Sequence, residues 1–515
     1  MAELKETCQK IKDFFRIEKI EDLSPKLSEV VFSSDSFQIY DDYIALVGNL
    51  EVDYIQKCYQ FFLADRGKNS MQQDYTPPSI AKLVAELADC SSGGTVLDCC
   101  AGSGAITIAK HRKDNSLRFV CQELDGNVIP LLLFNLAIRG IEAVVIHGNV
   151  LTGKCKKIYS LKPMDKYSKV EEISEYTLGQ YDACISNPPY NISWFVPEDD
   201  DLRFIEYGIP PKTNANFAFV LNSLHHTKKG GKAVLILPCG IMSTSNSEVA
   251  IRANLSKAGY VDSVISLPDK MFESTSISTC ILTIRNKVGD KKTTLIDSRR
   301  TYHEDVRHQR GEGSRSHTER VYHKIFKILT DEDISTIMQA IKKRDTVPGF
   351  CATVSVSDFV AEEYIWAPSR YIELVCEEEK HRPYADIISD LRAIAKEKAA
   401  IKITMNETVA KKLGFDKVYE DVAKSQELTK QMNNNVLKLL GLEPIEGNPW
   451  LALSKRAGEI KIENTSKNSV SSVIMMFLPM LKQHIYYLND VENKLLAELR
   501  DALLPDFMSG KINVK

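Results

Sequence analysis

The feature that most constrains the fold is the alternation of short β-rich runs with helical patterns between residues 71 and 290. Several of these runs are continuously apolar, as in strands that are buried on both faces of a sheet. Strands that alternate with helices form parallel sheets with right-handed crossovers. The sequence therefore predicts an α/β fold built on a doubly wound sheet. The expected strands cover 95–100, 118–123, 143–148, 181–186, 232–237, 263–267 and 280–284.

The alternation of expected strands and helices is less regular at the end of this region. Only twelve residues, 268–279, separate the last two expected strands, which is short for a helical crossover. These strands are expected to form an antiparallel pair at one edge of the sheet. The stretch 285–325 is polar and rich in Arg and His, so it is expected to be a loop. The charges from Arg299 to Lys327 either contact DNA phosphates or form a solvated surface.

The composition is that of a globular protein with several domains. The chain has 515 residues, of which 43% are hydrophobic and 26% charged, and its 66 basic and 69 acidic residues give a net charge of −3. These values exclude a largely disordered chain and a strongly basic coat. The longest apolar stretches, such as Val473–Leu481, are far shorter than the ~20 residues that a membrane helix needs. No association with a membrane is expected.

The cysteines indicate a cytoplasmic protein without a metal site. The twelve cysteines are scattered from Cys8 to Cys376 and form no C-x-x-C pair, the spacing typical of metal ligands. The N-terminus also lacks the apolar core of a signal peptide. We expect reduced cysteines and a cytoplasmic location.

Three regions are expected along the chain. Residues 1–70 and 376–515 are helix-patterned, and residues 71–375 contain the predicted sheet. Apolar residues recur at helical spacing in the last region, which predicts helices with one buried face. These stripes either pack on each other as an internal hairpin or bind a partner. The two stripes comprise Ile387, Leu391, Ile394, Ile401 and Met405, and Ile485, Leu488, Val491, Leu495, Leu499 and Leu503.

A nucleoside site is expected where the first predicted strand ends. Asp98 lies in that strand, and Gly102 and Gly104 then lead into an apolar helix. The glycines let the backbone approach a ligand closely, and the helix N-terminus offers unpaired N–H groups. A tight turn that binds nothing would show the same pattern. Glu123, at the end of the next strand, favours a ligand because an acidic residue there accepts hydrogen bonds from ribose hydroxyls.

The strongest catalytic candidate is the sequence Asn187-Pro188-Pro189-Tyr190, which directly follows the expected strand 181–186. The two prolines end the strand and stiffen the loop. The side-chain oxygen of Asn187 and the carbonyl of Pro188 are acceptors that can hold a substrate –NH₂ and aim its nitrogen. The ring of Tyr190 offers a flat face for a planar base, and its hydroxyl is expected to be dispensable. A proline-rich turn with a packed tyrosine is the structural alternative.

These motifs resemble those of S-adenosylmethionine-dependent amino-methyltransferases. The resemblance is closest to the adenine-N6 DNA methyltransferase M subunits of type I restriction–modification systems, and it covers about residues 40–375. The residues that match motifs of these M subunits are Gln73–Pro78, Asn187–Tyr190, Asp201, Arg203, Phe204, Tyr207, Gly208, Pro210, Pro211, Phe272, Thr275, Ile277, Cys280–Leu282 and Ser369–Ile372.

The resemblance implies a Rossmann-like class I methyltransferase domain, S-adenosyl-L-methionine as cofactor and double-stranded DNA as substrate. It also implies a helical C-terminal region that binds a specificity (S) subunit, with two M subunits to each S subunit. A restriction (R) subunit is a further partner that it allows. The implied catalytic residues are Asn187, Pro188, Pro189 and Tyr190, and the implied cofactor-binding residues are Gln73, Asp74, Tyr75, Thr76, Pro77, Pro78, Asp98, Gly102, Ser103, Gly104, Ala105, Glu123 and Asn149.

Three departures from the family pattern affect the cofactor site. Pro78 stands where the family has a basic residue, Cys99 follows Asp98 where the family favours Pro, and Asn149 stands where the family has Asp. Asn149 can still donate or accept one hydrogen bond to the adenine of the cofactor, but it lacks the charge.

The motifs predict methyl transfer to an amine. Two acceptors on the hydrogens of adenine N6 favour a more tetrahedral nitrogen that can attack the methyl group, and a base in a duplex must be flipped out to be reached. Two alternatives stay open: an amino-methyltransferase that acts on a protein glutamine or an RNA base, and a catalytically silent scaffold. The sequence contains no P-loop motif, so the chain is not expected to cut or translocate DNA by itself.

Overall fold

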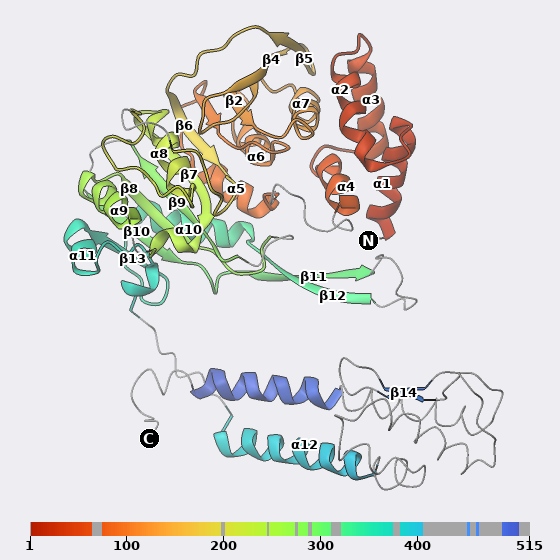
Figure 1. Cartoon of the computed structure of the whole chain (residues 1–515), viewed down its shortest axis with the longest axis vertical. Coiled ribbons are helices and arrows are strands. Elements are labelled where there is room, and N and C mark those ends of the chain that lie inside the picture. Colours follow the sequence, from red (N-terminus) through yellow and green to blue (C-terminus); the bar gives the residue numbers. More distant parts are fainter. Residues whose placement is uncertain are drawn as a thin grey trace, which may run out of the picture. The chain divides into compact units, whose positions relative to one another are not determined.

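The computed structural model divides the chain into two compact units, Met1–Val375 and Cys376–Lys515 (Figure 1). Among the described residues, no helix is both long enough and apolar enough to cross a membrane. The eleven cysteines among them are free. The structure describes residues 2–63, 75–196, 201–244, 247–272, 277–286, 291–310, 321–373, 382–404, 451–453, 460–462 and 487–503.

An eleven-stranded sheet forms the centre of the first unit. Strand β1 lies near its middle, flanked by β6 and β7 on one side and by β2 and β3 on the other, all parallel. Each of the seven strands expected from the sequence is present. In spatial order, the strands are β13 (Cys351–Ser355), β10 (Lys292–Asp297), β8 (Val261–Ser266), β9 (Thr279–Arg285), β7 (Thr227–Pro238), β6 (Tyr181–Ser186), β1 (Thr95–Asp98), β2 (Arg118–Glu123), β3 (Ala143–Gly148), β4 (Cys155–Pro163) and β5 (Ser168–Ile173).

Helices cover both faces of this sheet, as a doubly wound fold requires. Side chains of α5, α6, α7 and α10 are part of one hydrophobic core, and side chains of α8, α9 and α11 are part of a second core on the other face. The prediction of a doubly wound α/β fold is confirmed. These helices are α5 (Pro78–Leu87), α6 (Ala105–Lys113), α7 (Ile129–Ala137), α8 (Asn216–His225), α9 (Ser247–Ala258), α10 (Asp331–Lys343) and α11 (Val356–Ala361).

The N-terminal helices pack on the sheet domain and belong to the same compact unit. The rings of Phe15, Tyr40 and Tyr43 meet Phe134 of α7 edge to face, with centroids 5.3–5.9 Å apart. Such aromatic contacts bury much apolar area and fix the relative orientation of the helices. The N-terminal helices are α1 (Ala2–Phe15), α2 (Leu23–Val31), α3 (Ser36–Val47) and α4 (Tyr54–Leu63).

The position of the antiparallel strands corrects one expectation from the sequence. Strands β8 and β9 are antiparallel, as predicted, but they do not lie at an edge. Strand β9 inserts between β7 and β8, and β10 and β13 then extend the sheet. The sequence did not reveal β10 because its two threonines give a short run without a clear apolar pattern.

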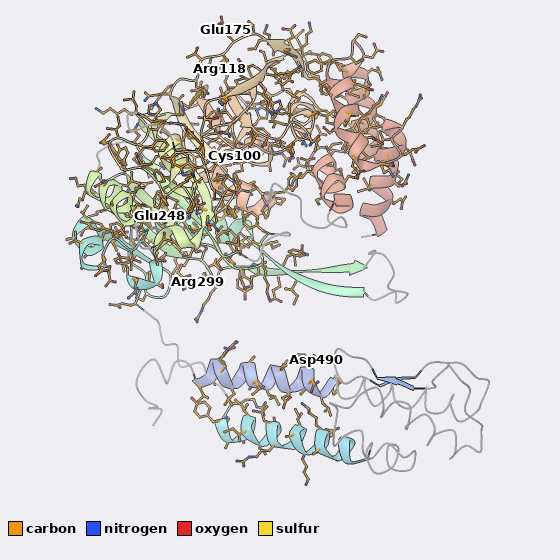
Figure 2. All side chains as sticks on the ribbon, in the orientation of Figure 1. Cys100, Arg118, Glu175, Glu248, Arg299 and Asp490 are labelled. Carbon is orange, nitrogen blue, oxygen red and sulfur yellow. The ribbon has the colours of Figure 1, made fainter. Side chains whose placement is uncertain are left out.

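The expectation of a loop over 285–325 is wrong. This stretch contains β10 and also β11 (His303–Arg310), which pairs with β12 (Val321–Ile328) in a separate two-stranded ribbon. Figure 1 shows the ribbon as a long hairpin, and the exposed Arg299 shortly before it is labelled in Figure 2. Val306 is the one apolar residue of β11, so this strand does not show the alternation on which strand prediction depends.

Two long helices of the second unit pack against each other. Helix α12 (Tyr384–Thr404) and the helix over 487–503 run antiparallel, because Tyr384 Oη donates to the carbonyl of Ala502 (3.2 Å) and Lys398 Nζ lies 2.7 Å from Glu492 Oε2. Their shared core comprises Ile387, Leu391, Ile394, Leu488, Val491, Leu495 and Leu499. This arrangement matches the internal hairpin that the sequence left open, while Met405 and Ile485 lie outside the described residues.

Two short strands complete the description of the second unit. Strands β14 (Leu451–Leu453) and β15 (Ile460–Ile462) pair antiparallel. Asp490, on the helix over 487–503, is exposed to solvent (Figure 2).

Candidate active site

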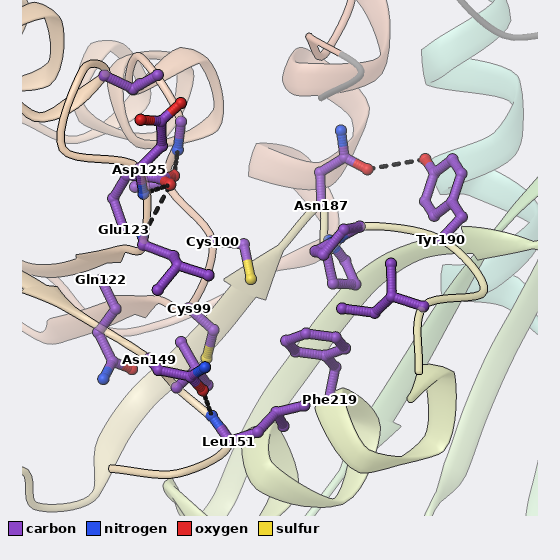
Figure 3. Close-up of a pocket in the computed structure, with 18 of the residues that line it drawn as sticks. Cys99, Cys100, Gln122, Glu123, Asp125, Asn149, Leu151, Asn187, Tyr190 and Phe219 are labelled. Atoms are coloured by element: carbon purple, nitrogen blue, oxygen red, sulfur yellow. Dashed lines mark hydrogen bonds between the residues drawn. The ribbon is translucent and has the colours of Figure 1, made fainter. Parts of the chain in front are cut away.

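A pocket of about 320 Å³ lies at the carboxyl ends of four neighbouring parallel strands (Figure 3). Its walls come from the segments that follow β6, β1, β2 and β3. Ligands of open α/β sheets bind at this edge, because the connections from adjacent strands diverge there and leave a crevice. The residues that line the pocket include Tyr75, Thr76, Cys99–Ser103, Ala105, Gln122–Asp125, Asn149–Thr152, Asn187–Tyr190, Trp194, Phe195 and Phe219.

The turn between β1 and α6 requires glycine at position 104. Gly104 has φ of +96°, a left-handed conformation that residues with a side chain rarely adopt. A Cβ at this position would also lie only 3.0 Å from a methyl carbon of Leu132. Gly104 therefore allows α6 to begin close to α7, and it brings Gly102 and Ser103 to the pocket wall.

The carboxylate of Glu123 is held in a defined orientation at the pocket. Its Oε2 accepts the backbone N–H of Gly102 (2.9 Å), and its Oε1 accepts the backbone N–H groups of Leu124 and Asp125 (2.8 Å each). Burial raises the pKa of Glu123, and the three N–H donors oppose that rise. The carboxylate oxygens retain lone pairs, so they can accept hydroxyl groups of a ligand.

Asp98 lies beneath the turn and does not line the pocket. Its side chain is 1% exposed, and its Oδ2 accepts a hydrogen bond from Thr107 Oγ1 (2.7 Å). Its other oxygen, Oδ1, is buried without a hydrogen-bond partner among the described residues. Burial raises the pKa of Asp98 to about 7. The position of Asp98 indicates that it supports the turn rather than contacting a ligand in the pocket directly.

Two hydroxyl groups fix the amide of Asn187. Its Nδ2 donates to Thr76 Oγ1 (3.0 Å), and its Oδ1 accepts from the hydroxyl of Tyr190 (2.8 Å; Figure 3). Tyr190 is 5% exposed and its ring meets Phe272 edge to face. The hydroxyl of Tyr190 therefore has a defined contact, which the sequence did not indicate.

Asn149 uses its oxygen within the chain. Its Oδ1 accepts the backbone N–H groups of Leu151 (2.9 Å) and Thr152 (3.1 Å), which closes a turn at the end of β3. Only the amide –NH₂ of Asn149 is then available to a ligand, because the oxygen already meets two donors.

The guanidinium group of Arg203 stabilises the loop that follows Asn149. Its guanidinium donates to the carbonyl of Leu151 (2.8 Å) and to Asn222 Oδ1 on α8 (3.1 Å), and it pairs with Asp201 (2.6 Å). The Asp201 and Arg203 positions, which match a family motif in the sequence, therefore stabilise a wall of the pocket.

The pocket brings together most of the predicted site residues. Four others, Pro77, Pro78, Asp98 and Gly104, do not line it, and Gln73 and Asp74 lie outside the described residues. Pro77 and Pro78 begin α5, where proline is favourable because no N–H is needed. The predicted residues that do line the pocket are Tyr75, Thr76, Gly102, Ser103, Ala105, Glu123, Asn149, Asn187, Pro188, Pro189 and Tyr190.

Several pocket residues were not identified from the sequence. Gln122, Asp125, Trp194 and Phe219 line the pocket without belonging to an expected motif. Gln122 and Asp125 are close to Glu123 in sequence, so that proximity was an available signal. Trp194 and Phe219 gave no such signal. Among the described residues, no group of three or more His, Cys, Asp or Glu side chains is placed to hold a metal ion.

Comparisons with known proteins identify the family of this chain. Residues 51–380 match the model of the family described as N-6 DNA Methylase. The chain is 27% identical over 384 residues to the type I restriction enzyme HindI methylase subunit of Haemophilus influenzae, covering 70% of this chain and 78% of that protein. It is 24% identical to the type I restriction enzyme MjaIX methylase subunit of Methanocaldococcus jannaschii, covering 64% of this chain and 57% of that protein.

A solved structure supports the fold assignment. The type I restriction-modification system methyltransferase subunit from Streptococcus thermophilus superposes with a TM-score of 0.51 at 21% identity, covering 72% of this chain and 80% of that one. The predictions of a class I methyltransferase fold and of an adenine-N6 DNA methyltransferase related to type I M subunits are confirmed. Because the family model matches well over half of the sequence, the chain belongs to the N-6 DNA methylase family.

Proposed function

We propose that this chain transfers a methyl group from S-adenosyl-L-methionine to N6 of an adenine flipped out of double-stranded DNA. The observation that carries the proposal is that Asn187 and Tyr190 line the same pocket as the glycine turn and Glu123. An amine held at Asn187 would therefore lie beside a nucleoside held at Glu123. Membership of the N-6 DNA methylase family supports the same reaction.

The pocket fits the nucleoside part of the cofactor. A Cβ built on Gly102 would meet no atom within 4 Å, so a ligand has room beside this turn. The glycine turn, Gly102–Ala105, would approach the methionine part, and Glu123 would accept hydrogen bonds from the ribose hydroxyls. When bound, S-adenosyl-L-methionine supplies a methyl group activated by its sulfonium.

Asn187 and Pro188 would align the substrate amine. The two hydrogens of N6 would be accepted by Asn187 Oδ1 and by the carbonyl of Pro188, which directs the nitrogen lone pair toward the methyl group. Oδ1 has two lone pairs, so it can accept the amine while it still accepts from Tyr190. No general base is needed before attack, because the amine proton becomes acidic once the nitrogen carries the methyl group.

The family favours DNA over the other substrates that the sequence left open. A protein glutamine or an RNA base would present the same –NH₂ group to Asn187. None of the residues that the structure describes favours either of them, or a catalytically silent scaffold, over a DNA adenine. Tyr190 would hold the flipped base by contact with its ring, which offsets part of the cost of unstacking.

The proposal extends to partners and regions. The relatives named above are methylase subunits of type I restriction enzymes, which supports binding of an S subunit and leaves an R subunit as a further partner. We assign residues 1–70 to a helical domain, 71–375 to methyl transfer and 376–515 to binding the S subunit, with two copies of this chain to one S subunit. The cytoplasmic location stays a prediction.

The decisive experiment separates chemistry from cofactor binding. With purified chain and its S subunit, Asn187→Ala should abolish tritium transfer from labelled S-adenosylmethionine to DNA, because the amine loses an acceptor. Calorimetry should show unchanged cofactor affinity for this variant. Glu123→Ala is the reverse control, and it should weaken cofactor binding by roughly 1–3 kcal/mol. Near-normal methyl transfer by Asn187→Ala would refute the proposed role.

A further inference from the structure

Gln122 carries a buried polar atom for which the described part of the chain provides no partner. Its side chain is 5% exposed, and its Oε1 has no hydrogen-bond partner among the described residues. A buried amide oxygen without a donor is costly, so native proteins almost always satisfy it. Gln122 also lines the pocket, where a ligand can supply that donor.

The backbone holds Gln122 firmly in this position. Its carbonyl accepts the N–H of Ala101 (3.0 Å), which joins the end of β2 to the glycine turn. Gln122 is also in register with Ile146 of β3. Because successive side chains of a strand alternate between faces, Gln122 and Glu123 approach the pocket from opposite faces of the sheet. Two polar groups of one strand can therefore contact different parts of one ligand.

The strand order indicates which part of the cofactor lies near Gln122. The strands follow one another as β6, β1, β2 and β3. If the reacting end lies at Asn187 after β6 and the ribose lies at Glu123 after β2, the base lies toward β3. Figure 3 shows Gln122 and Asn149 toward one side of the pocket, and Asn187 and Tyr190 toward the other.

The base of the cofactor carries an exocyclic amine that needs an acceptor. Asn149 is the nearest candidate by its place after β3, but its Oδ1 already accepts two backbone N–H groups. Its remaining –NH₂ is a donor, which suits a ring nitrogen of adenine and not the amine. An acceptor for the amine must therefore come from another residue.

We infer that Gln122 is a specificity-determining residue whose side-chain oxygen accepts the exocyclic amine of the cofactor's adenine. The inference rests on the proposed function, since it presumes that S-adenosyl-L-methionine occupies this pocket. A rotation of the terminal amide brings either its oxygen or its nitrogen to the pocket, so the ligand decides which atom faces it. Gln122 thus provides the acceptor that Asn149 lacks.

Binding measurements with two ligands test the inference without reference to activity. The ligands are S-adenosylhomocysteine and its analogue with hydrogen in place of the 6-amino group. By calorimetry, the wild-type chain should bind the amino compound about tenfold more tightly than the analogue. Gln122→Met, which preserves length and volume, should bind both compounds equally. Discrimination that persists in Gln122→Met would overturn the inference.

Unfolding of the ligand-free chain provides a second readout. Because Gln122→Met removes an unpaired buried oxygen, its melting temperature should equal or exceed that of the wild type. A clear drop would show that the amide serves the fold, and it would overturn the inference. Gln339→Met, an exposed change on α10, is the matched control and should leave both readouts unchanged. If the wild type binds neither compound, the proposed function fails as well, whereas retained discrimination in Gln122→Met refutes the inference alone.

Discussion

The orientation of a single amide, that of Asn187, decides whether an acceptor faces the substrate amine. Thr76 and Tyr190 contact opposite ends of this amide: its nitrogen donates to Thr76 and its oxygen accepts from Tyr190. Thr76 precedes α5 and Tyr190 follows β6, so residues distant in sequence determine the orientation. Because the amide is oriented before the substrate binds, it does not have to reorient during the reaction.

This arrangement predicts the effect of removing the Tyr190 hydroxyl. Tyr190→Phe keeps the ring but loses the donor to Asn187 Oδ1, so we expect kcat to fall about fivefold, the equivalent of about 1 kcal/mol. Single-turnover methyl transfer measures this change. Cofactor affinity should be unchanged, and Tyr176→Phe at an exposed position is the control. An unchanged kcat for Tyr190→Phe would show that Thr76 alone suffices to orient the amide.

Asp98 makes the stability of the cofactor-free chain depend on pH. Burial raises the pKa of Asp98 from 3.8 to about 7 in the folded state. The stability of the fold with protonated Asp98 is therefore fully present below pH ~4, and it is lost as the pH rises to 7 and the buried carboxyl becomes charged. Asp98→Asn has no charge at this position. Its free energy of unfolding, measured in urea, should therefore rise relative to that of the wild type between pH 5 and 8. The expected gain is on the order of 2 kcal/mol, and a constant difference across this range would contradict it.

At the scale of elements, the ribbon of β11 and β12 has basic residues in both of its strands. Arg307 of β11 is in backbone register with Lys324 of β12. Basic residues in both strands of a ribbon suit contacts with DNA phosphates. We propose that this ribbon contacts DNA.

The ribbon is expected to contribute salt-dependent affinity for DNA. Replacing Arg307 and Lys324 by Gln should lower the slope of log affinity against log salt by about 2, because two phosphate contacts are lost. Lys162 and Lys169 form a matched control, since they are also cross-strand partners, in β4 and β5, and both pair with Glu171. Titration of a duplex at several salt concentrations measures both variants. An equal effect of the two double substitutions would show that the ribbon has no special role.

At the scale of the whole molecule, the helical pair of the second unit uses its apolar stripes internally. Leu495 lies in the shared core at 9% exposure, whereas its neighbour Leu496 is 49% exposed. Leu496, Ile388 and Tyr487 are exposed, so the shared core leaves these apolar side chains uncovered among the described residues. We propose that Leu496 contacts a partner. The apolar stripes that form the shared core are already buried against each other, so they give no reason to expect a partner there.

Substitutions at Leu495 and Leu496 can distinguish an effect on folding from an effect on assembly with the S subunit. Leu496→Asp should leave the ligand-free chain folded but weaken its association with the S subunit at least tenfold, measured by sedimentation or native mass spectrometry. Leu495→Asp should instead destabilise the helical pair by roughly 2–4 kcal/mol, because a charge enters its core. If Leu496→Asp assembles normally, the S subunit binds elsewhere on the chain. The wild-type chain without an S subunit should bind cofactor but should not methylate one defined site.

The sequence alone was sufficient for the local features of this protein. The seven expected strands form because their apolar runs suit burial on both faces, and that property is local. Asn187, Tyr190, Glu123 and Gly102 were assigned to one site because each follows a strand or ends one, and parallel strands bring those ends to one edge.

The tertiary structure decided everything that depends on a partner distant in sequence. The strand β10 exists because β8 and β13 supply its hydrogen bonds. Asp98 was assigned to the ligand and instead lies beneath the turn, since burial cannot be read from its motif. The side-chain oxygen of Asn149 accepts two backbone N–H groups, whereas that of Gln122 has no partner in the described part of the chain, although both are amides at strand ends. The sequence specifies the type of each side chain. The atoms that folding brings around it determine which hydrogen bonds it can still form with a ligand.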